Sequence, residues 1–368
     1  MKRGRFDRTL VLLLAVLVIG GCMIFASAAF GLLARGSTNM SSVLFGHLAL
    51  GVGLGLVALI VGATIDYRVW RKYAPYIFGL AVLATLAVFI PHIGFAHGGG
   101  RRWILLAGIS FQPAEGLKIA AIMLAAAYYS TIGRRSETFT YGLGGFAAIL
   151  ALPVFILVAQ PDIGTLGVIC IGVGAVYFAA GASWKQIGVT LCIAIVALGS
   201  LTLVRPYMKD RIMTFIHPSQ GQQAESYQLK QSLIAIGSGG LLGRGFGQGI
   251  QKFTYLPEPM GDSIFAVAAE EMGFVGSVVI VLLFLGFALR GFSVAARASD
   301  HFGSLLAVGL STYLSAEAFI NIASMLGVAP LTGIPLTFVS QGGSAMLASL
   351  GAAGILLNIS RARSRKTS

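Results

Sequence analysis

Long apolar runs, separated by short polar segments, repeat along this chain from one end to the other. Each run comes close to the roughly 20 residues that a helix needs to cross the hydrocarbon core of a bilayer. The apolar residues follow one another without the strict alternation that is typical of the strands of a membrane β-barrel. Because only helices and closed barrels satisfy their backbone hydrogen bonds within lipid, the pattern predicts an all-α, multi-pass membrane protein.

Ten runs have the character of transmembrane helices. They cover residues 10–33, 43–64, 75–91, 113–129, 141–158, 164–180, 187–204, 263–289, 302–326 and 345–359. The first run follows a basic tail, as the apolar region of a signal peptide does. Its length and the many later runs favour a transmembrane helix instead. We therefore expect a single integral-membrane domain over residues 1–368, with one large polar loop at residues 205–262.

Composition agrees, because hydrophobic residues make up 56% of the chain and charged residues only 11%. An ordinary soluble domain carries about 25% charged residues. A net charge of +13 would suggest nucleic-acid binding in a soluble protein. Here the cationic residues stand in short loops and tails, so we expect no nucleic-acid partner and interpret the charge as a topology signal.

The distribution of Lys and Arg predicts the side of the membrane that each loop occupies. With ten spans, the tails share one side with the loops that follow the even-numbered spans. That side carries Lys2, Arg3, Arg5, Arg8, Arg68, Arg71, Lys72, Arg134, Arg135, Lys185, Arg290, Arg297, Arg361, Arg363, Arg365 and Lys366. The short loops of the other side carry Arg35, Arg101 and Arg102. Since cytoplasmic loops collect Lys and Arg, both termini are predicted to be cytoplasmic.

The long loop at residues 205–262 is therefore predicted to be extracytoplasmic. Loops of this length are usually functional or disordered, and residues 227–236 show a helical pattern that favours partial order. Glycines at residues 237–249 either bring backbone N–H groups to a phosphate or form a glycine-rich turn. The loop ends at Asp262, a carboxylate at the membrane boundary, which is either a functional group or a favourable residue at a helix N-terminus.

Two further outer segments carry charge. Arg101 and Arg102 precede Trp103, and this group either anchors the interface or binds phosphate through the guanidinium groups. Glu115 and Lys118 lie three residues apart at the start of a span, so they share a helix face. They are either a neutral pair that orients helices or the polar wall of a substrate cavity.

Two outer turns complete the polar segments of that side. Asp162 follows a proline, which is ordinary turn chemistry, and we interpret it as structural. Ser340 and Gln341 stand in a segment of small and hydroxyl residues that either binds sugar or diphosphate groups or allows close helix packing. The three cysteines and five histidines show no metal-ligand spacing.

These segments together resemble the SEDS family, which includes FtsW and RodA. The resemblance covers essentially the whole chain and rests on six ordered motifs: residues 101–104, 111–118, 160–165, 231–240, 256–271 and 333–344. Residues 227–236 and a short segment of the first span are closer to FtsW. Members usually have Thr and Phe on either side of the aspartate, where this chain has Gly261 and Ser263. They also have Tyr in place of Gln341.

The resemblance implies a peptidoglycan glycosyltransferase of the bacterial cytoplasmic (inner) membrane. Such an enzyme polymerises lipid II into glycan strands at the outer face, in cell division or elongation. Its implied partners are a class B penicillin-binding protein, which is the transpeptidase, and other divisome or elongasome membrane proteins. The alternatives are a lipid II flippase and a non-catalytic scaffold for the transpeptidase.

The family's essential aspartate corresponds to Asp262, which we predict to be the general base that activates a sugar hydroxyl. The predicted substrate-binding residues are Arg101, Arg102, Trp103, Glu115, Lys118, Arg211, Ser340 and Gln341. The leaving diphosphate would be stabilised by the cations of this group or by a divalent cation, Mg²⁺ or Mn²⁺. No ligands for such a metal are predicted, and no organic cofactor is implied.

Overall fold

The computed structural model describes residues 4–34, 40–97, 100–106, 109–204, 206–216 and 223–362. Arg35 and the outermost basic residues of both tails lie outside these ranges, as do residues 205 and 217–222 of the long loop. The first helices are α1 (Arg8–Ala34), α2 (Met40–Phe45), the π-helix η1 (Gly46–Gly53), α3 (Leu54–Thr64), α4 (Tyr67–Leu86), the 3₁₀-helix η2 (Ala87–Phe89), α5 (Pro113–Ile132), the 3₁₀-helix η3 (Gly133–Glu137), α6 (Gly142–Ala159) and α7 (Ile163–Ala179). The chain continues with α8 (Trp184–Val204), α9 (Pro206–Ile216), α10 (Gln223–Ser238), α11 (Gln251–Thr254), α12 (Ile264–Ala296), α13 (His301–Met325) and α14 (Gly343–Arg361).

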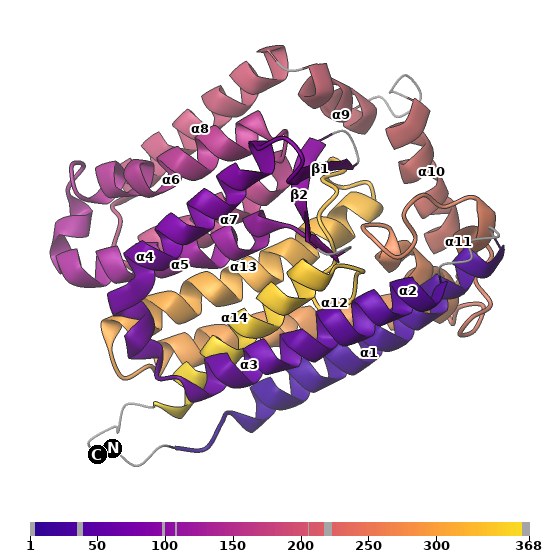
Figure 1. Cartoon of the computed structure of the whole chain (residues 1–368), viewed down its shortest axis with the longest axis horizontal. Coiled ribbons are helices and arrows are strands. Elements are labelled where there is room, and N and C mark those ends of the chain that lie inside the picture. Colours follow the sequence, from indigo (N-terminus) through magenta and orange to yellow (C-terminus); the bar gives the residue numbers. More distant parts are fainter. Residues whose placement is uncertain are drawn as a thin grey trace.

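The predicted all-α membrane fold is confirmed. Within the described ranges, nine helical stretches are long and apolar enough to cross a membrane. The remaining predicted span corresponds to α7, an apolar helix of 17 residues. Asp7 N donates to Ser360 Oγ at 3.2 Å, so the first and last helices meet at one end of the bundle (Figure 1). This agrees with an even number of spans, while the side of the membrane stays a prediction.

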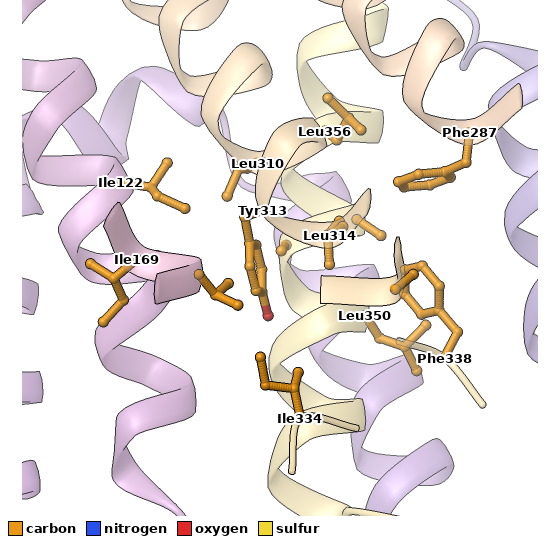
Figure 2. Packing of buried hydrophobic residues seen from close by; sticks show 14 of the residues in the cluster. Ile122, Ile169, Phe287, Leu310, Tyr313, Leu314, Ile334, Phe338, Leu350 and Leu356 are labelled. Carbon is orange, nitrogen blue, oxygen red and sulfur yellow. The ribbon is translucent and has the colours of Figure 1, made fainter. Parts of the chain in front are cut away.

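Helices α13 and α14 form the centre of the bundle (Figure 1). In their most apolar stretches, 72% and 78% of the residues are buried inside the protein. Figure 2 shows Tyr313 and Leu310 of α13 among side chains of the neighbouring helices. Small residues allow this packing: a Cβ on Gly309 would lie only 2.5 Å from Cγ2 of Ile122 in α5.

Helix α8 differs, because none of its most apolar stretch is buried inside the protein. It lies along the edge of the bundle, beyond α6 and α7 (Figure 1). An apolar helix of this kind is expected to face lipid on most sides.

A small antiparallel sheet lies before α5. Its strands β1 (Gly94–His97), β2 (Gly100–Leu106) and β3 (Ile109–Phe111) follow one another in order. Ile104 stands opposite both Gly94 and Phe111, and its side chain is buried. This sheet carries the segment of Arg101 and Arg102, and the sequence pattern did not predict it.

The predicted helical pattern of the long loop is present in α10. The glycine-rich segment before α11 packs against the first third of α12, where Gly273 has a non-helical φ of 67°. A Cβ on Gly273 would lie 2.2 Å from the backbone nitrogen of Gly243, so the close crossing requires glycine.

Carboxylates of α12 already bind the backbone of that glycine-rich segment. Gly247 N donates to Glu271 Oε2 at 3.0 Å, and Ile250 N donates to Glu270 Oε1 at 2.8 Å. Lys252 Nζ lies 2.6 Å from Glu271 Oε1 and is fully buried. Because these N–H groups are bound internally, the structure favours the glycine-rich turn over a phosphate-binding loop.

Candidate functional site

Asp262 is the second residue before α12, at the end of the long loop, and its side chain is partly exposed. The side-chain nitrogen of Gln228 in α10 donates to Asp262 Oδ1 at 3.0 Å. The same nitrogen donates to Ser263 Oγ at 3.0 Å. Helix α10 of the long loop therefore contacts the carboxylate directly.

Asn321 of α13 holds the backbone at this point. Its side-chain nitrogen donates to the carbonyl oxygens of Asp262 and Ile334, each at 2.8 Å. Asn321 is fully buried, so it joins the aspartate loop to the segment between α13 and α14 within the core.

Ser340 makes a second connection between these segments. Its hydroxyl donates to the carbonyl oxygen of Gly261 at 2.7 Å and accepts from Leu336 N at 2.7 Å. Gln341 N also donates to the carbonyl oxygen of Met260 at 2.7 Å. Ser340 is buried and positions the aspartate loop, whereas the side chain of Gln341 is exposed and stays a predicted substrate contact.

The surroundings of Asp262 shift the pKa of its carboxyl group toward neutral pH. Burial raises the pKa of Asp262 to about 6, the hydrogen bond from Gln228 opposes this rise, and the negative charge of Glu258 adds to it. The charge of Arg211 has a smaller lowering effect on the same pKa. Glu258 has a left-handed backbone with φ 42°, which is uncommon for a residue other than glycine.

Arg211 lies in α9 and reaches the same region. Its Nε is 3.1 Å from Glu225 Oε1 in α10, so an ion pair joins the two helices. A Cβ on Gly333 would lie 3.8 Å from Arg211 Nη2. The guanidinium group is therefore beside the segment that Asn321 and Ser340 attach to Asp262.

A buried charge cluster lies on the inner helices. Lys118 Nζ is 2.8 Å from Glu115 Oε2, as the spacing predicted, and 2.7 Å from Glu317 Oε1 in α13. All three side chains are at most 3% exposed. The pair found in the sequence is thus part of a triad whose second carboxylate comes from another helix.

A cavity of about 60 Å³ connects this triad to the β-hairpin. Its lining residues include Arg102, Trp103, Gln112, Glu115, Lys118, Asp162, Glu317 and the backbone segment Gly333, Ile334 and Pro335. A water molecule needs about 10–15 Å³ by this kind of measure, so the cavity holds a few waters and is too small for a sugar ring.

Arg102 is the cation of the hairpin that enters this cavity. Its guanidinium group donates to the carbonyl oxygen of Pro161 and lies 3.9 Å from Asp162 Oδ1. Asp162 accepts from the Gln112 side chain at 3.1 Å and from Thr165 N at 3.3 Å. Asp162 thus caps α7, as its structural interpretation implies, and it also forms a wall of the cavity.

The predicted residues therefore fall into two neighbouring groups. One group surrounds the cavity and contains Arg102, Trp103, Glu115 and Lys118. The other contains Asp262, Arg211, Ser340 and Gln341, and residues 333–341 run between the two. Arg101 is exposed on β2 and does not line the cavity.

The predicted divalent cation has no evident protein site among the described residues. Within the described ranges, no group of three or more His, Cys, Asp or Glu side chains could hold a metal ion. Mg²⁺ often binds one or two carboxylates and takes its other ligands from substrate phosphates and water. A divalent cation therefore stays a prediction, and no residues of this chain are assigned to it as ligands.

Three polar residues of the site were not predicted from the sequence. Glu317 could have been found, because a carboxylate inside an apolar span is a functional candidate by default. Asn321 lies one turn further along the same span and gives a weaker signal. Gln228 lies in the FtsW-like segment 227–236, but nothing in that pattern distinguishes it from the other polar residues of α10.

Comparison with known proteins establishes the family. Residues 7–365 match the model of a family that comprises FtsW, RodA and SpoVE and is described as "Cell cycle protein". The chain belongs to this family. The resemblance found in the six sequence motifs is thereby confirmed.

Several relatives match over most of their length. Stage V sporulation protein E of Bacillus subtilis is 35% identical over 362 residues, which cover 98% of each chain. The probable peptidoglycan glycosyltransferase FtsW of Geobacter sulfurreducens is 40% identical over 311 residues, covering 83% of this chain and 82% of the relative. The peptidoglycan glycosyltransferase MrdB of Escherichia coli is 34% identical over 357 residues, covering 96% and 93%.

Solved structures agree with this fold. The rod shape determining protein RodA of Thermus thermophilus has a TM-score of 0.70 at 26% identity, and the match covers 98% of each chain. A chain of a peptidoglycan synthase complex that coordinates polymerization and crosslinking has a TM-score of 0.78 at 25% identity. That match covers 98% of this chain and 99% of the other.

Proposed function

We propose that this chain is a peptidoglycan glycosyltransferase that polymerises lipid II at the outer face of the bacterial cytoplasmic membrane, with both termini in the cytoplasm. The observation that carries the proposal is the environment of Asp262. The carboxylate ends the long loop at the start of a span, accepts a hydrogen bond from Gln228 and has a pKa raised to about 6. Relatives that match most of the chain are named peptidoglycan glycosyltransferases.

In the proposed reaction, a sugar hydroxyl attacks the anomeric carbon of a second, lipid-linked sugar. The hydroxyl proton passes to the Asp262 carboxylate, the new glycosidic bond forms, and the bond to the diphosphate oxygen breaks. A base with a pKa near the working pH combines a large ionised fraction with useful basicity. Asp262 meets this requirement better than an ordinary exposed aspartate.

Among the predicted cations, Arg102 and Arg211 fit the leaving diphosphate best. Arg102 lines the cavity, and its Nε is buried without a hydrogen-bond partner among the described residues. Lys118 is less suited, because two carboxylates already share its charge. When bound, a divalent cation would add positive charge at the same diphosphate.

A class B penicillin-binding protein is the partner that this function requires, because glycan strands must be crosslinked after they are polymerised. A similar chain occurs in a peptidoglycan synthase complex. Relatives include FtsW, MrdB and a sporulation protein, so division, elongation and their accessory membrane proteins are all compatible with the proposal.

The test is polymerisation of fluorescent lipid II by the purified protein with a class B partner, with and without Mg²⁺ or Mn²⁺. Wild type is expected to form long glycan chains, and Asp262→Asn is expected to form none while expressing normally. Normal polymer from a folded Asp262→Asn variant would refute the base assignment.

The same preparation separates the alternatives. In vesicles, a change in the sidedness of labelled lipid II without chain growth would indicate a flippase. No polymer and no movement of lipid from wild type, in a verified complex with the transpeptidase, would indicate a scaffold.

A further inference from the structure

Gln228 connects the long extracytoplasmic loop to the carboxylate of Asp262. Its side-chain nitrogen lies 3.0 Å from Asp262 Oδ1 and 3.0 Å from Ser263 Oγ. A primary amide has two N–H donors, so one nitrogen can serve both acceptors at once. The geometry fixes the rotation of the carboxylate relative to α12.

The backbone of Asp262 is held by other residues. Asn321 binds its carbonyl oxygen at 2.8 Å, and Ser340 binds that of Gly261 at 2.7 Å. Neither contact involves Gln228. Loss of the Gln228 side chain should therefore leave the aspartate loop in place and change only the orientation and the charge of the carboxylate.

We propose that Gln228 is a positioning residue for the reaction, which keeps the carboxylate of Asp262 oriented and ionised so that helix α10 completes the catalytic base. The inference rests on the proposed function. A hydrogen bond to the charged form of a carboxylate favours that form. The extracytoplasmic loop then contributes to catalysis through the side-chain amide of Gln228.

Other charged groups around Asp262 also affect the protonation of its carboxyl group. Arg211 of α9 favours the ionised carboxylate, and Glu258 of the preceding turn disfavours it. Asn321 of α13 contacts the backbone of Asp262, and its amide carries no charge. Removal of Gln228 leaves burial and Glu258 opposed only by the backbone hydrogen bond to the Asp262 carboxylate and by Arg211, so the carboxylate should bind its proton more tightly.

The experiment measures protonation of Asp262 without relying on turnover. The purified full chain is treated with a carbodiimide, which reacts with protonated carboxyl groups, and labelling of Asp262 is followed by mass spectrometry from pH 4 to pH 9. Gln228→Leu is expected to move the labelling midpoint upward by about one pH unit, as expected for loss of a hydrogen bond to a charged group. Polymerisation near pH 7 should fall by about twofold from the smaller ionised fraction, and further from the lost orientation of the carboxylate.

The matched control is Gln231→Leu, on the same helix. The side chain of Gln231 is partly exposed like that of Gln228, so the substitution is comparable in size and setting. Its midpoint and rate should equal those of wild type. An unchanged midpoint in Gln228→Leu would overturn the inference, whatever happens to its rate.

Gln228→Glu keeps the size of the side chain and decides the question if Gln228→Leu does not fold. A second carboxylate beside Asp262 should move the midpoint upward even further, because like charges disfavour ionisation. Labelling also separates the two proposals. If the midpoint shifts in Gln228→Leu but wild type forms no polymer, the result counts against the glycosyltransferase alone. If wild type forms polymer but the midpoint does not shift in Gln228→Leu, it counts against the role of Gln228 alone.

Discussion

Asn321 holds Asp262 by its backbone: the side-chain nitrogen of Asn321 lies 2.8 Å from the carbonyl oxygen of Asp262. The same nitrogen lies 2.8 Å from the carbonyl oxygen of Ile334, and Ile334 lines the cavity that contains Arg102. One buried amide in α13 thus joins the predicted base to the group of residues around the cavity. The two halves of the site should not move independently.

Asn321→Leu should therefore impair both stability and activity. The substitution leaves two carbonyl oxygens without their donor, which costs about 1–3 kcal/mol for each buried group. It also frees the aspartate loop from residues 333–341, so polymerisation by the folded fraction should fall at least about tenfold, as loss of positioning implies. Thermal unfolding in detergent and the lipid II assay measure the two effects.

The matched control is Asn358→Leu in α14. Asn358 also binds two backbone groups, the carbonyl oxygen of Ala63 at 2.7 Å and Tyr67 N at 3.1 Å. We expect a similar loss of stability with unchanged activity per folded molecule. Equal activity loss in the two variants would show that Asn321 has no special relation to Asp262.

The raised pKa of Asp262 predicts the pH dependence of polymerisation. The base must be ionised, so the rate should fall as pH decreases through about 6. Glu258→Gln removes a negative charge that raises this pKa. The acidic limb of the pH–rate profile, where the rate falls with decreasing pH, should therefore move to lower pH. Rates measured from pH 4.5 to pH 8 at saturating lipid II test both statements.

Glu137→Gln is the control for that shift, because Glu137 is an exposed carboxylate on the loop after α5, which is predicted to be cytoplasmic. Its acidic limb should match wild type. A limb that does not respond to Glu258→Gln would mean that a group other than Asp262 titrates in the reaction.

Local patterns predicted the spans and the Glu115–Lys118 pair, because hydropathy and a three-residue spacing need no knowledge of tertiary structure. Glu317 and Asn321 reach the site from α13, about 200 residues after α5, and only packing brings them there. The sheet of β1 to β3 was missed, since its strands are short and interrupted by glycines. Ser263, which departs from the family pattern, proves to be an acceptor for Gln228.

Lys118→Met should strongly destabilise the protein. Glu115 and Glu317 would then face each other in the core without a cation, and removal of one partner from a buried ion pair costs about 3–5 kcal/mol. The triple variant with Lys118→Met, Glu115→Gln and Glu317→Gln removes all three charges and should recover most of the lost unfolding temperature.

Activity of the folded triple variant decides what the triad does. We expect polymerisation at least about tenfold below wild type, because the cavity has lost the charges that form its polar wall. A folded triple variant with wild-type activity would show that the triad serves only to orient α5 against α13.

Asp300 provides a stability test far from the predicted reaction centre. It caps α13 by accepting from Gly303 N at 2.9 Å, pairs with Arg68 Nε at 3.2 Å and accepts from the Tyr67 hydroxyl. Burial alone would raise the pKa of Asp300, but the hydrogen bonds from Tyr67 and Gly303 and the charge of Arg68 outweigh it and lower the pKa. The carboxylate therefore stabilises the fold above its unfolded pKa of about 3.9, and this contribution is lost as pH falls through the lower folded value.

Asp300→Ala should lower the free energy of unfolding by about 1–2 kcal/mol at pH 7, as expected for loss of a helix cap. Asp300→Asn keeps the acceptor for Gly303 N and should lose less. The advantage of wild type over Asp300→Asn should disappear in strong acid, where the carboxylate is protonated.

The control is Asp66→Ala. It removes the exposed cap of α4, which accepts from Arg68 N at 3.0 Å, and should cost less stability than Asp300→Ala. Equal losses from the two alanine variants would show that the contacts with Tyr67 and Arg68 contribute nothing beyond the cap.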